Sequence, residues 1–353
     1  MKTRHHQPGY IARGRSLIEM MIAILIGSLV LAGVLIIASG SITVGRRADS
    51  LGGLSDTGQT ALQLLSADVR MAGYSLPRTY FVAGYETKML STAGIRGCDA
   101  GFTDNSVAQF NALSCKTGTS ASGGAMSISY EADEFNSILV TNSAGALVPS
   151  DCRGTGLVAL TGLKGNTERP MSGQDSMSTS PAYWRVENRY YIANSSTDGE
   201  PTLFCLGNGG ASPGFGAGQS PQALVRGVER MVLSYGVAIG AIEKDKSEAV
   251  LVIGNPSVAT YMSASAIDTK WIDETPDVRW QRVVSVRVCL ETRGDVGSIE
   301  KITDSQNPSF INCDGVATEI TDKRARRAVR MTMNLRNRTT AVDKITGIGL
   351  GGV

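Results

Sequence analysis

Few residues of this chain are placed to do acid–base or nucleophilic chemistry. Its two histidines, His5 and His6, both lie before residue 15. The absence of histidine downstream excludes Ser/His/Asp and Cys/His nucleophile arrangements there, and it removes the commonest zinc ligand. Most hydrolase mechanisms are therefore excluded, and we expect no catalytic residue, no metal and no cofactor.

Six cysteines are the other reactive side chains. They are Cys98, Cys115, Cys152, Cys205, Cys289 and Cys313. An even number of cysteines in an oxidising compartment indicates a set of disulfides. Among the pairings that six cysteines allow we favour the sequential one, 98 with 115, 152 with 205 and 289 with 313. A metal site is disfavoured because the chain has no C-x-x-C pair.

The charges nearly cancel, with 34 Lys and Arg against 32 Asp and Glu. Such a chain has no global field for holding a polyanion, which excludes a histone-like role. One basic concentration lies near the carboxyl end and comprises Lys323, Arg324, Arg326, Arg327, Arg330, Arg336 and Arg338. It could bind DNA or an acidic partner. Because no aromatic residues interleave to stack bases, we favour an exposed strand face with its preceding loop and do not expect DNA as a partner.

One carboxylate, that of Glu19, lies among apolar residues, and the N-terminal segment must position it. A short basic leader precedes an apolar run from Leu17 to Ala38. As a helix this run rises about 33 Å, enough to cross a hydrocarbon core of about 30 Å. The positive-inside rule keeps the leader cytoplasmic, so we expect the rest of the chain to be exported.

A cleavable signal peptide is an alternative for this segment, because Ala38, Ser39 and Gly40 are small enough for a signal peptidase site. The apolar core of a signal peptide is, however, shorter than this run. A carboxylate within an apolar span costs about 2.5 to 3.5 kcal/mol on insertion scales. Glu19 therefore indicates a partner or a position near the interface, for which a signal peptide has no use.

Residues 14–19, Gly-Arg-Ser-Leu-Ile-Glu, resemble the cleavage site of type IV prepilins. The resemblance implies that a prepilin peptidase cuts after Gly14 and methylates the new amino terminus of Arg15. Glu19 would then be the fifth mature residue, which in the family meets the terminal ammonium of a neighbouring subunit during assembly. Two groups that are costly to bury alone become tolerable together. Arg15 departs from the family's usual Phe or Met, and as an i, i+4 neighbour it could neutralise Glu19 within one subunit.

A second helical segment follows the apolar run. Apolar or small residues recur in it at three- and four-residue spacing: Leu51, Leu54, Gly58, Ala61, Leu62, Leu65 and Val69. The pattern predicts an amphipathic helix that continues the membrane segment and ends near Gly73 as carboxyl cap. Glycines in a helix interior cost about 1 kcal/mol each, so we expect a bend or partial unwinding between Gly45 and Gly58. A separate short helix after a loop is the alternative.

The remaining chain is rich in strands and loops. Residues 116–125, 172–181 and 207–220 read as loops, and short β-type pieces lie at 126–130, 138–141 and 190–193. Alternating apolar residues predict half-buried strands at 284–290 and 329–335 and a further strand at 224–237. We predict an α+β fold in which a long N-terminal helix, transmembrane in its first half, packs on an antiparallel β-sheet with large loop-rich insertions.

Several later blocks are similar to the PilW family of minor pilins. They are Ala67–Tyr74, Leu203–Gly207, Leu224–Arg230, Val284–Cys289 and Leu335–Arg338. The resemblance implies a pilin-like fold and a non-enzymatic minor subunit of a type IV pilus that primes assembly at or near the tip. It implies as partners prepilin peptidase, other minor pilins, the major pilin and a tip adhesin. It also implies an inner-membrane location, with the N-terminus cytoplasmic, before incorporation into the extracellular pilus.

These inferences divide the chain into four parts. They are a leader (1–14), a transmembrane half of the helix (15–38), a periplasmic amphipathic half (39–73) and a periplasmic β-rich domain with disulfides (74–353). Two alternatives remain open. A J-type pseudopilin of a type II secretion system would have the same membrane helix and similar size. A signal-anchored periplasmic enzyme or binding protein is disfavoured by the missing histidines and by the lack of a convergent acidic or nucleophilic motif.

Three short motifs receive a plain structural interpretation. Gly154–Ala159 matches the dinucleotide pattern G-x-G-x-x-A by letter, but no βαβ pattern surrounds it, so we expect a turn. The acidic stretches Asp99–Asp104 and Asp198–Glu200 do not have the spacing of a calcium loop. We expect both stretches to be solvated turns.

Overall fold

The computed structural model divides into two compact units, residues 1–50 and 51–353, which are described separately. The described residues are 16–75, 77–79, 86–88, 93–107, 110–160, 183–210, 214–215, 219–239, 241–245, 248–252, 257–299 and 307–338. Two features expected from the sequence lie outside them. They are the leader, with Gly14 and Arg15, and the loop at 172–181.

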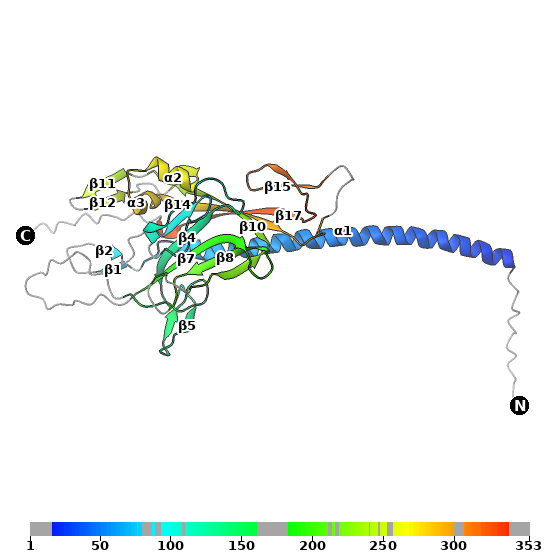
Figure 1. Ribbon diagram of the computed structural model, residues 1–353, viewed down its shortest axis with the longest axis horizontal. Helices are drawn as coiled ribbons and strands as arrows, with labels where there is room; N and C mark the ends of the chain where they lie inside the picture. The colour runs from blue at the N-terminus through cyan, green and yellow to red at the C-terminus, as the bar shows by residue number, and fades with distance from the viewer. Residues whose placement is uncertain are drawn as a thin grey trace, which may run out of the picture. The chain divides into compact units, whose positions relative to one another are not determined.

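A single helix, α1, runs from Leu17 to Met71 and is drawn in blue in Figure 1. Its first part, the 22-residue segment Leu17–Ala38, has a mean hydropathy of 2.9 and is not buried by the rest of the chain. This is the one described helix that is long and apolar enough to cross a membrane. The predicted transmembrane helix is therefore present by length and composition.

The predicted interruption of this helix is wrong. The helix continues without a break across the glycines between residues 45 and 58. The cost of about 1 kcal/mol per glycine is small in a 55-residue helix, because each added residue of a formed helix contributes a hydrogen bond. Gly45, Gly52 and Gly53 are exposed, and Gly58 lies in the packed face. The predicted end of the helix is correct. Gly73 has φ 71°, and its N–H donates a hydrogen bond to the Ser129 carbonyl at 2.9 Å.

The second half of α1 packs on the strands of its own unit. Its buried residues, each at most 5% exposed, are Leu54, Ala61, Leu62, Leu65 and Val69. Their spacing places them on one face of the helix, as predicted. Gly58 lies in the same face, where a Cβ would come within 2.5 Å of the Val329 Cγ2. Leu51 was expected in this face but is 43% exposed, because the packed face begins one turn later.

Two antiparallel sheets form the body of the second unit. The first has the order β3-β4-β7-β8-β9. Its strands are β3 (Ile95–Cys98), β4 (Ala125–Ala132), β7 (Trp184–Asn194), β8 (Pro201–Gly207) and β9 (Gln222–Arg226). The predicted pieces at 126–130 and 190–193 lie within β4 and β7.

The second sheet has the order β13-β10-β14-β17. Its strands are β13 (Thr260–Met262), β10 (Val228–Val237), β14 (Val283–Arg293) and β17 (Arg326–Asn334). A parallel bridge between Gly123 and Met231 joins it to the first sheet, and the Gly124 N–H donates to the Met231 carbonyl at 2.7 Å. Buried side chains from both sheets and from α1 therefore contribute to one hydrophobic core.

The sequence prediction fails in two details of these strands. Residues 224–237 form two strands rather than one, because Gly227 has φ 75° and separates β9 from β10. The predicted polar face of β14 is also mostly buried, with Arg287 its exposed residue. A disulfide from Cys289 and the ion pair of Glu291 with Arg230 cover that face.

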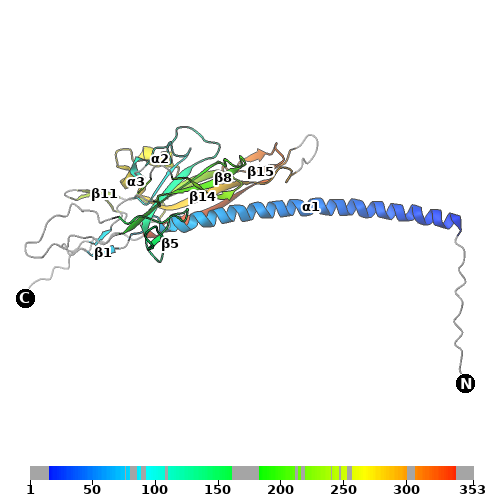
Figure 2. The ribbon, with the colours of Figure 1, turned by 60° about the horizontal axis from the view of Figure 1, so that its bottom comes forward.

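Short hairpins and helices complete the described fold. They are β1 (Pro77–Thr79) with β2 (Glu86–Lys88), β5 (Leu139–Thr141) with β6 (Leu147–Pro149), β11 (Ala241–Asp245) with β12 (Glu248–Val252), β15 (Ser309–Ile311) with β16 (Ala317–Glu319), α2 (Ala264–Lys270), α3 (Pro276–Trp280), and the 3-10 turns η1 (Phe110–Ala112) and η2 (Arg336–Arg338). In the turned view of Figure 2 the carboxyl-terminal part of α1 lies against the strands. Earlier in the helix, the Thr292 Oγ1 donates to the Leu54 carbonyl at 3.2 Å. The predicted α+β fold, with a long N-terminal helix on antiparallel strands, is confirmed.

Candidate assembly helix and its anchorage

The amino end of α1 presents a carboxylate among apolar side chains. Glu19 lies in the first turn of the helix and is exposed. Leu17 and Ile18 beside it are 78% and 65% exposed. The Ser16 carbonyl accepts the Glu19 N–H at 3.0 Å, which starts the helix, and the helix dipole favours a carboxylate in this turn. This end of α1 thus offers both an apolar surface and one acidic group.

The carboxyl end of α1 is held by a second acidic residue, Asp68. Its Oδ2 accepts hydrogen bonds from the Tyr190 hydroxyl and from the Asn188 Nδ2, each at 2.5 Å. Its Oδ1 accepts one from the Tyr130 hydroxyl at 3.2 Å. These donors lie on β4 and β7, so one helix side chain binds two neighbouring strands of the first sheet.

The pKa values in this cluster follow from its burial. Desolvation raises the pKa of Asp68 above its ordinary value, although the hydrogen bonds from Tyr190, Asn188 and Tyr130 oppose the change. Desolvation, followed by the nearby Asp68 charge, also raises the pKa values of Tyr190 and Tyr130. Both tyrosines therefore remain protonated donors at physiological pH, which suits them to hold Asp68.

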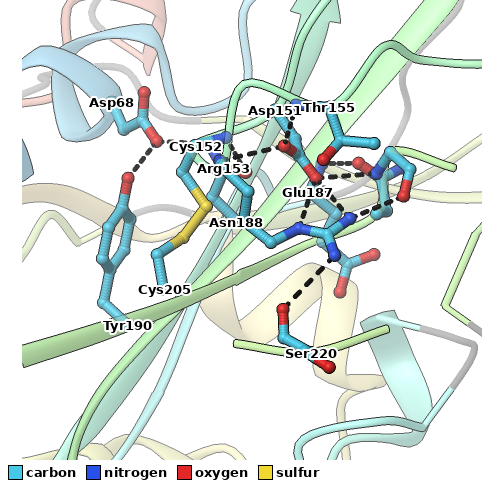
Figure 3. Close-up of a disulfide and its surroundings, with 12 residues drawn as sticks. Asp68, Asp151, Cys152, Arg153, Thr155, Glu187, Asn188, Tyr190, Cys205 and Ser220 are labelled. Atoms are coloured by element: carbon cyan, nitrogen blue, oxygen red, sulfur yellow. Dashed lines mark hydrogen bonds and ion pairs between the residues drawn. A yellow bond between two sulfur atoms is a disulfide. The ribbon is translucent and has the colours of Figure 1, made fainter. Parts of the chain in front are cut away.

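Asn188 connects this helix anchor to a disulfide, as Figure 3 shows. Its Nδ2 donates to Asp68, while its Oδ1 accepts the N–H of Cys152 at 3.1 Å. Cys152 is bonded to Cys205 on β8. Two hydrogen bonds and the disulfide thus connect α1 to β7, β7 to the turn at residues 151–155, and this turn to β8. The disulfide therefore fixes the turn that orients the Asn188 amide.

A buried aspartate builds that turn. The Asp151 Oδ1 accepts the N–H groups of Arg153 and Thr155 at 2.9 and 3.0 Å. Its Oδ2 accepts the Gly209 N–H at 2.9 Å and lies 2.8 Å from the Arg153 guanidinium. Gly154 has φ 72° at the tip. The predicted turn at Gly154 is confirmed, because the Gly154 N–H donates to the Asp151 carbonyl at 2.9 Å.

A second buried ion pair lies on the same strand. The side chains of Glu187 and Arg189 are 0% exposed and 2.5 Å apart. Arg189 also donates to the carbonyls of Asn105 and Val107, at 2.5 and 2.7 Å. Burial raises the pKa of Glu187, while the positive charge of Arg189 opposes that change. The pair therefore attaches the loop after β3 to strand β7, which is a structural role.

The six cysteines form three disulfides in the sequential order that the sequence analysis favoured. Cys98 is bonded to Cys115, Cys152 to Cys205 and Cys289 to Cys313. Each bond joins a strand of a principal sheet to a loop or turn. Together the disulfides fix loop-rich segments onto the two sheets.

In the first half of the basic concentration, Arg324 and Arg326 are paired with carboxylates. Arg324 lies 3.0 Å from Glu200. Arg326 lies 2.7 Å from both Glu229 and Asp322. These pairs tie β17 and its preceding loop to β10 and to the residue before β8, and Arg293 on β14 joins the same network through Glu200 at 2.9 Å. The preference for a strand face and its preceding loop agrees with this arrangement.

The two acidic turns have partners of their own. Asp99 accepts the N–H groups of Ala264 and Ser265, each at 2.9 Å, and so caps the amino end of α2. Asp198 and Glu200 pair with arginines. The expectation of solvated turns is therefore wrong for Asp99 and incomplete for Glu200. Among the described residues no group of three or more His, Cys, Asp or Glu side chains is placed to hold a metal ion.

Residues 189–337 match the family model of type IV pilus-assembly protein W, PilW. This part of the chain is a PilW-like domain. The matched residues begin in β7 and end in η2, so they include β8, β9, β10, β14 and β17. Residues 12–35 match the prokaryotic N-terminal methylation motif, which includes Gly14, Arg15 and Glu19.

One solved structure with a similar arrangement is the type IV-like pilin TTHA1219 from Thermus thermophilus. It is 11% identical, covers 81% of this chain and 98% of its own, and has a TM-score of 0.34. At this TM-score the likeness supports no further inference. No curated protein matches the chain. The likeness to pilus proteins therefore depends on the PilW match and the methylation motif.

Sequence reasoning named Glu19 and the cysteines but not the anchor of the helix. Asp68 was noted only as part of a PilW-like block, and Asn188, Glu187 and Arg189 were not singled out. The sequence did contain a signal for Asp68, because a polar residue that interrupts a periodic row of apolar residues often has a buried partner. The partner of Asp68 is 120 positions away, and spacing alone does not identify it.

Proposed function

We propose that this PilW-domain protein is a minor pilin of a type IV pilus that helps to prime assembly. In this proposal a prepilin peptidase cleaves after Gly14, and the new amino terminus of Arg15 is methylated. The helix holds the protein in the inner membrane, with the leader cytoplasmic and the disulfide-linked domain periplasmic. The mature subunit then enters the pilus at or near its tip, together with other minor pilins.

Glu19 carries the proposal. It stands at the fifth position after Gly14 and is the one charged residue in the segment Leu17–Ala38. A carboxylate in such a span is tolerated when it meets an opposite charge. The methylated terminal ammonium of a neighbouring subunit would supply that charge. A solitary membrane anchor gives no reason to retain the carboxylate.

The size of the second unit supports a position at the tip rather than in the shaft. Shaft subunits repeat closely, and bulky loops obstruct their lateral packing. Here the β5–β6 and β15–β16 hairpins extend an already large pair of sheets. Exposed apolar residues on these hairpins, Leu147 at 66% and Val316 at 58%, would have to be accommodated at each repeat.

A J-type pseudopilin would share the membrane helix and the methylation motif. The match of residues 189–337 to the pilus-assembly family favours the pilus. The two assignments also predict different phenotypes. Deleting a minor pilin lowers the number of surface pili, whereas deleting a pseudopilin blocks protein secretion and leaves the pili unchanged.

Intact mass of the membrane-extracted protein tests the processing step. We expect a chain that begins at Arg15 and carries one added methyl group. A retained leader, or a chain that begins near residue 40, would overturn the proposal. Gly14→Ala should block cleavage and serves as the matched uncleaved control.

A second experiment tests the role of Glu19 in assembly. Glu19→Gln keeps the size of the side chain but removes its charge, so we expect normal membrane insertion and loss of the protein from sheared pili. Asp56→Asn, on the exposed face of the same helix, is the control and should assemble normally. Wild-type amounts of the Glu19→Gln protein in pili would contradict the assigned role.

A further inference from the structure

The outer edge of β17 is a long strand edge that faces away from its sheet. β17 has nine residues and pairs with β14 on one side. In the described strand order it is the terminal strand of the second sheet. The opposite terminal strand, β13, has three residues. Unpaired edges of this length are templates for another strand, and proteins usually shorten, charge or cover them.

The hydrogen bonds to β14 determine which backbone groups face outward. The Leu335 N–H donates to the Val284 carbonyl, and the Gly294 N–H donates to the Ala325 carbonyl, each at 2.9 Å. In an antiparallel pair alternate residues direct both backbone groups to the same side. Odd-numbered residues of β17 therefore face β14. Ala328, Arg330, Thr332 and Asn334 direct their N–H and C=O groups to the open side.

Two arginines on this strand differ from their neighbours. Arg327 and Arg330 are exposed, and no carboxylate of the described residues lies within ion-pair distance of either. Arg326 next to them is paired with Glu229 and Asp322. Arg330 makes one hydrogen bond, from its Nη2 to the Asn312 carbonyl at 2.6 Å. Because successive side chains alternate, Arg327 and Arg330 place positive charge on both faces of the edge.

We propose that the outer edge of β17 is a docking site for an extended, carboxylate-bearing segment of a partner protein, which adds to the second sheet as a strand. Outward backbone groups of residues 328–334 would supply the ladder hydrogen bonds. Arg327 and Arg330 would select acidic side chains opposite them, since opposite charges on paired strands stabilise and like charges destabilise. The inference does not depend on whether the helix enters a pilus.

A tethered strand tests this site on the full chain. A nine-residue strand with Glu at every third position and Thr elsewhere places carboxylates on both faces, at the spacing of Arg327 and Arg330. It is fused to the carboxyl terminus through about 20 Gly and Ser residues, which span roughly 25 Å and give a millimolar effective concentration. The matched fusion replaces each Glu with Lys. Hydrogen exchange is then measured at residues 326–334. We expect the outward amides of residues 328, 330, 332 and 334 to exchange at least about tenfold more slowly in the Glu fusion alone.

Two variants separate edge pairing from other contacts. Thr332→Pro removes an outward N–H and leaves the bonds to β14, which an edge strand tolerates, so protection in the Glu fusion should disappear. Thr332→Ala keeps the N–H and should keep the protection. The double variant Arg327→Glu with Arg330→Glu should transfer protection to the Lys fusion. Equal protection by both fusions, protection by neither, or an unchanged preference in the double variant would overturn the proposal.

Discussion

The side chain of Asn188 on β7 donates a 2.5 Å hydrogen bond to Asp68 on α1 across 120 positions of sequence. The same side chain accepts the backbone N–H of Cys152. One amide therefore links the helix, the first sheet and a disulfide-bonded turn. In a protein whose helix enters a filament, this link would transmit force from the helix to the globular domain.

Asp68→Ala should lower the free energy of unfolding by about 2 to 4 kcal/mol, because it leaves the hydroxyls of Tyr130 and Tyr190 and the Asn188 amide without their acceptor. Urea unfolding of the detergent-solubilised protein, followed by near-ultraviolet circular dichroism, measures the change. Asp56→Ala on the exposed face of the same helix is the control and should change it by less than about 0.5 kcal/mol. Equal losses in the two variants would contradict the anchor.

Gly58→Leu should destabilise the contact between α1 and β17 by about 1 to 3 kcal/mol, because a Cβ at this position would come within 2.5 Å of Val329. Gly53→Ala, where no atom lies within 4 Å of the added Cβ, is the helical control. That change should raise stability by roughly 1 kcal/mol through helix propensity. Thermal unfolding of both variants decides the point, and a stabilised Gly58→Leu protein would show that the helix does not pack here.

Removing the Cys152–Cys205 disulfide should cost more than removing Cys98–Cys115. The sequence separations are 53 and 17 residues, and chain entropy makes the longer loop worth about 1 kcal/mol more. Alanine replaces both cysteines of one pair at a time, and urea midpoints are compared at equal denaturant slope. Loss of the Cys152–Cys205 disulfide should also speed amide hydrogen exchange in the turn at residues 151–155. A larger loss from the 98–115 pair would contradict this ranking.

Acid should weaken the ion pair between Asp322 and Arg326 in a defined range. The hydrogen bonds from Arg326 lower the pKa of Asp322 from 3.8 to about 2. A carboxyl with a lowered folded-state pKa stabilises the fold above its unfolded pKa, and this contribution is lost as pH falls through the folded pKa. Wild type should therefore lose stability relative to Asp322→Asn between pH 3.8 and about 2. Parallel unfolding curves of the two proteins across this range would contradict the pair.

Local sequence patterns were sufficient for the features that depend on neighbours along the chain. Hydropathy over residues 17–38 predicted the apolar helix, since spanning a membrane requires only length and an apolar composition. Three- and four-residue spacing predicted the buried face at Leu54 to Val69, and Gly73 predicted its end. The residues around Gly14 and Glu19 identified the methylation motif. Each of these signals is contained within a few helical turns.

Features that depend on distant partners were decided by the tertiary structure alone. Gly58 packs against Val329 on β17 and lies within a continuous α1, although helix propensity alone disfavours glycine there. Gly227 divided one apolar run between two sheets, and β14 became buried on both faces when a disulfide and an ion pair covered its polar side. Asp68 gained three donors from β4 and β7, and Arg326 gained carboxylates from separate segments while Arg327 did not. A sequence specifies each of these side chains, but which of them meet is set by the sheet register, which brings residues a hundred positions apart within hydrogen-bond distance.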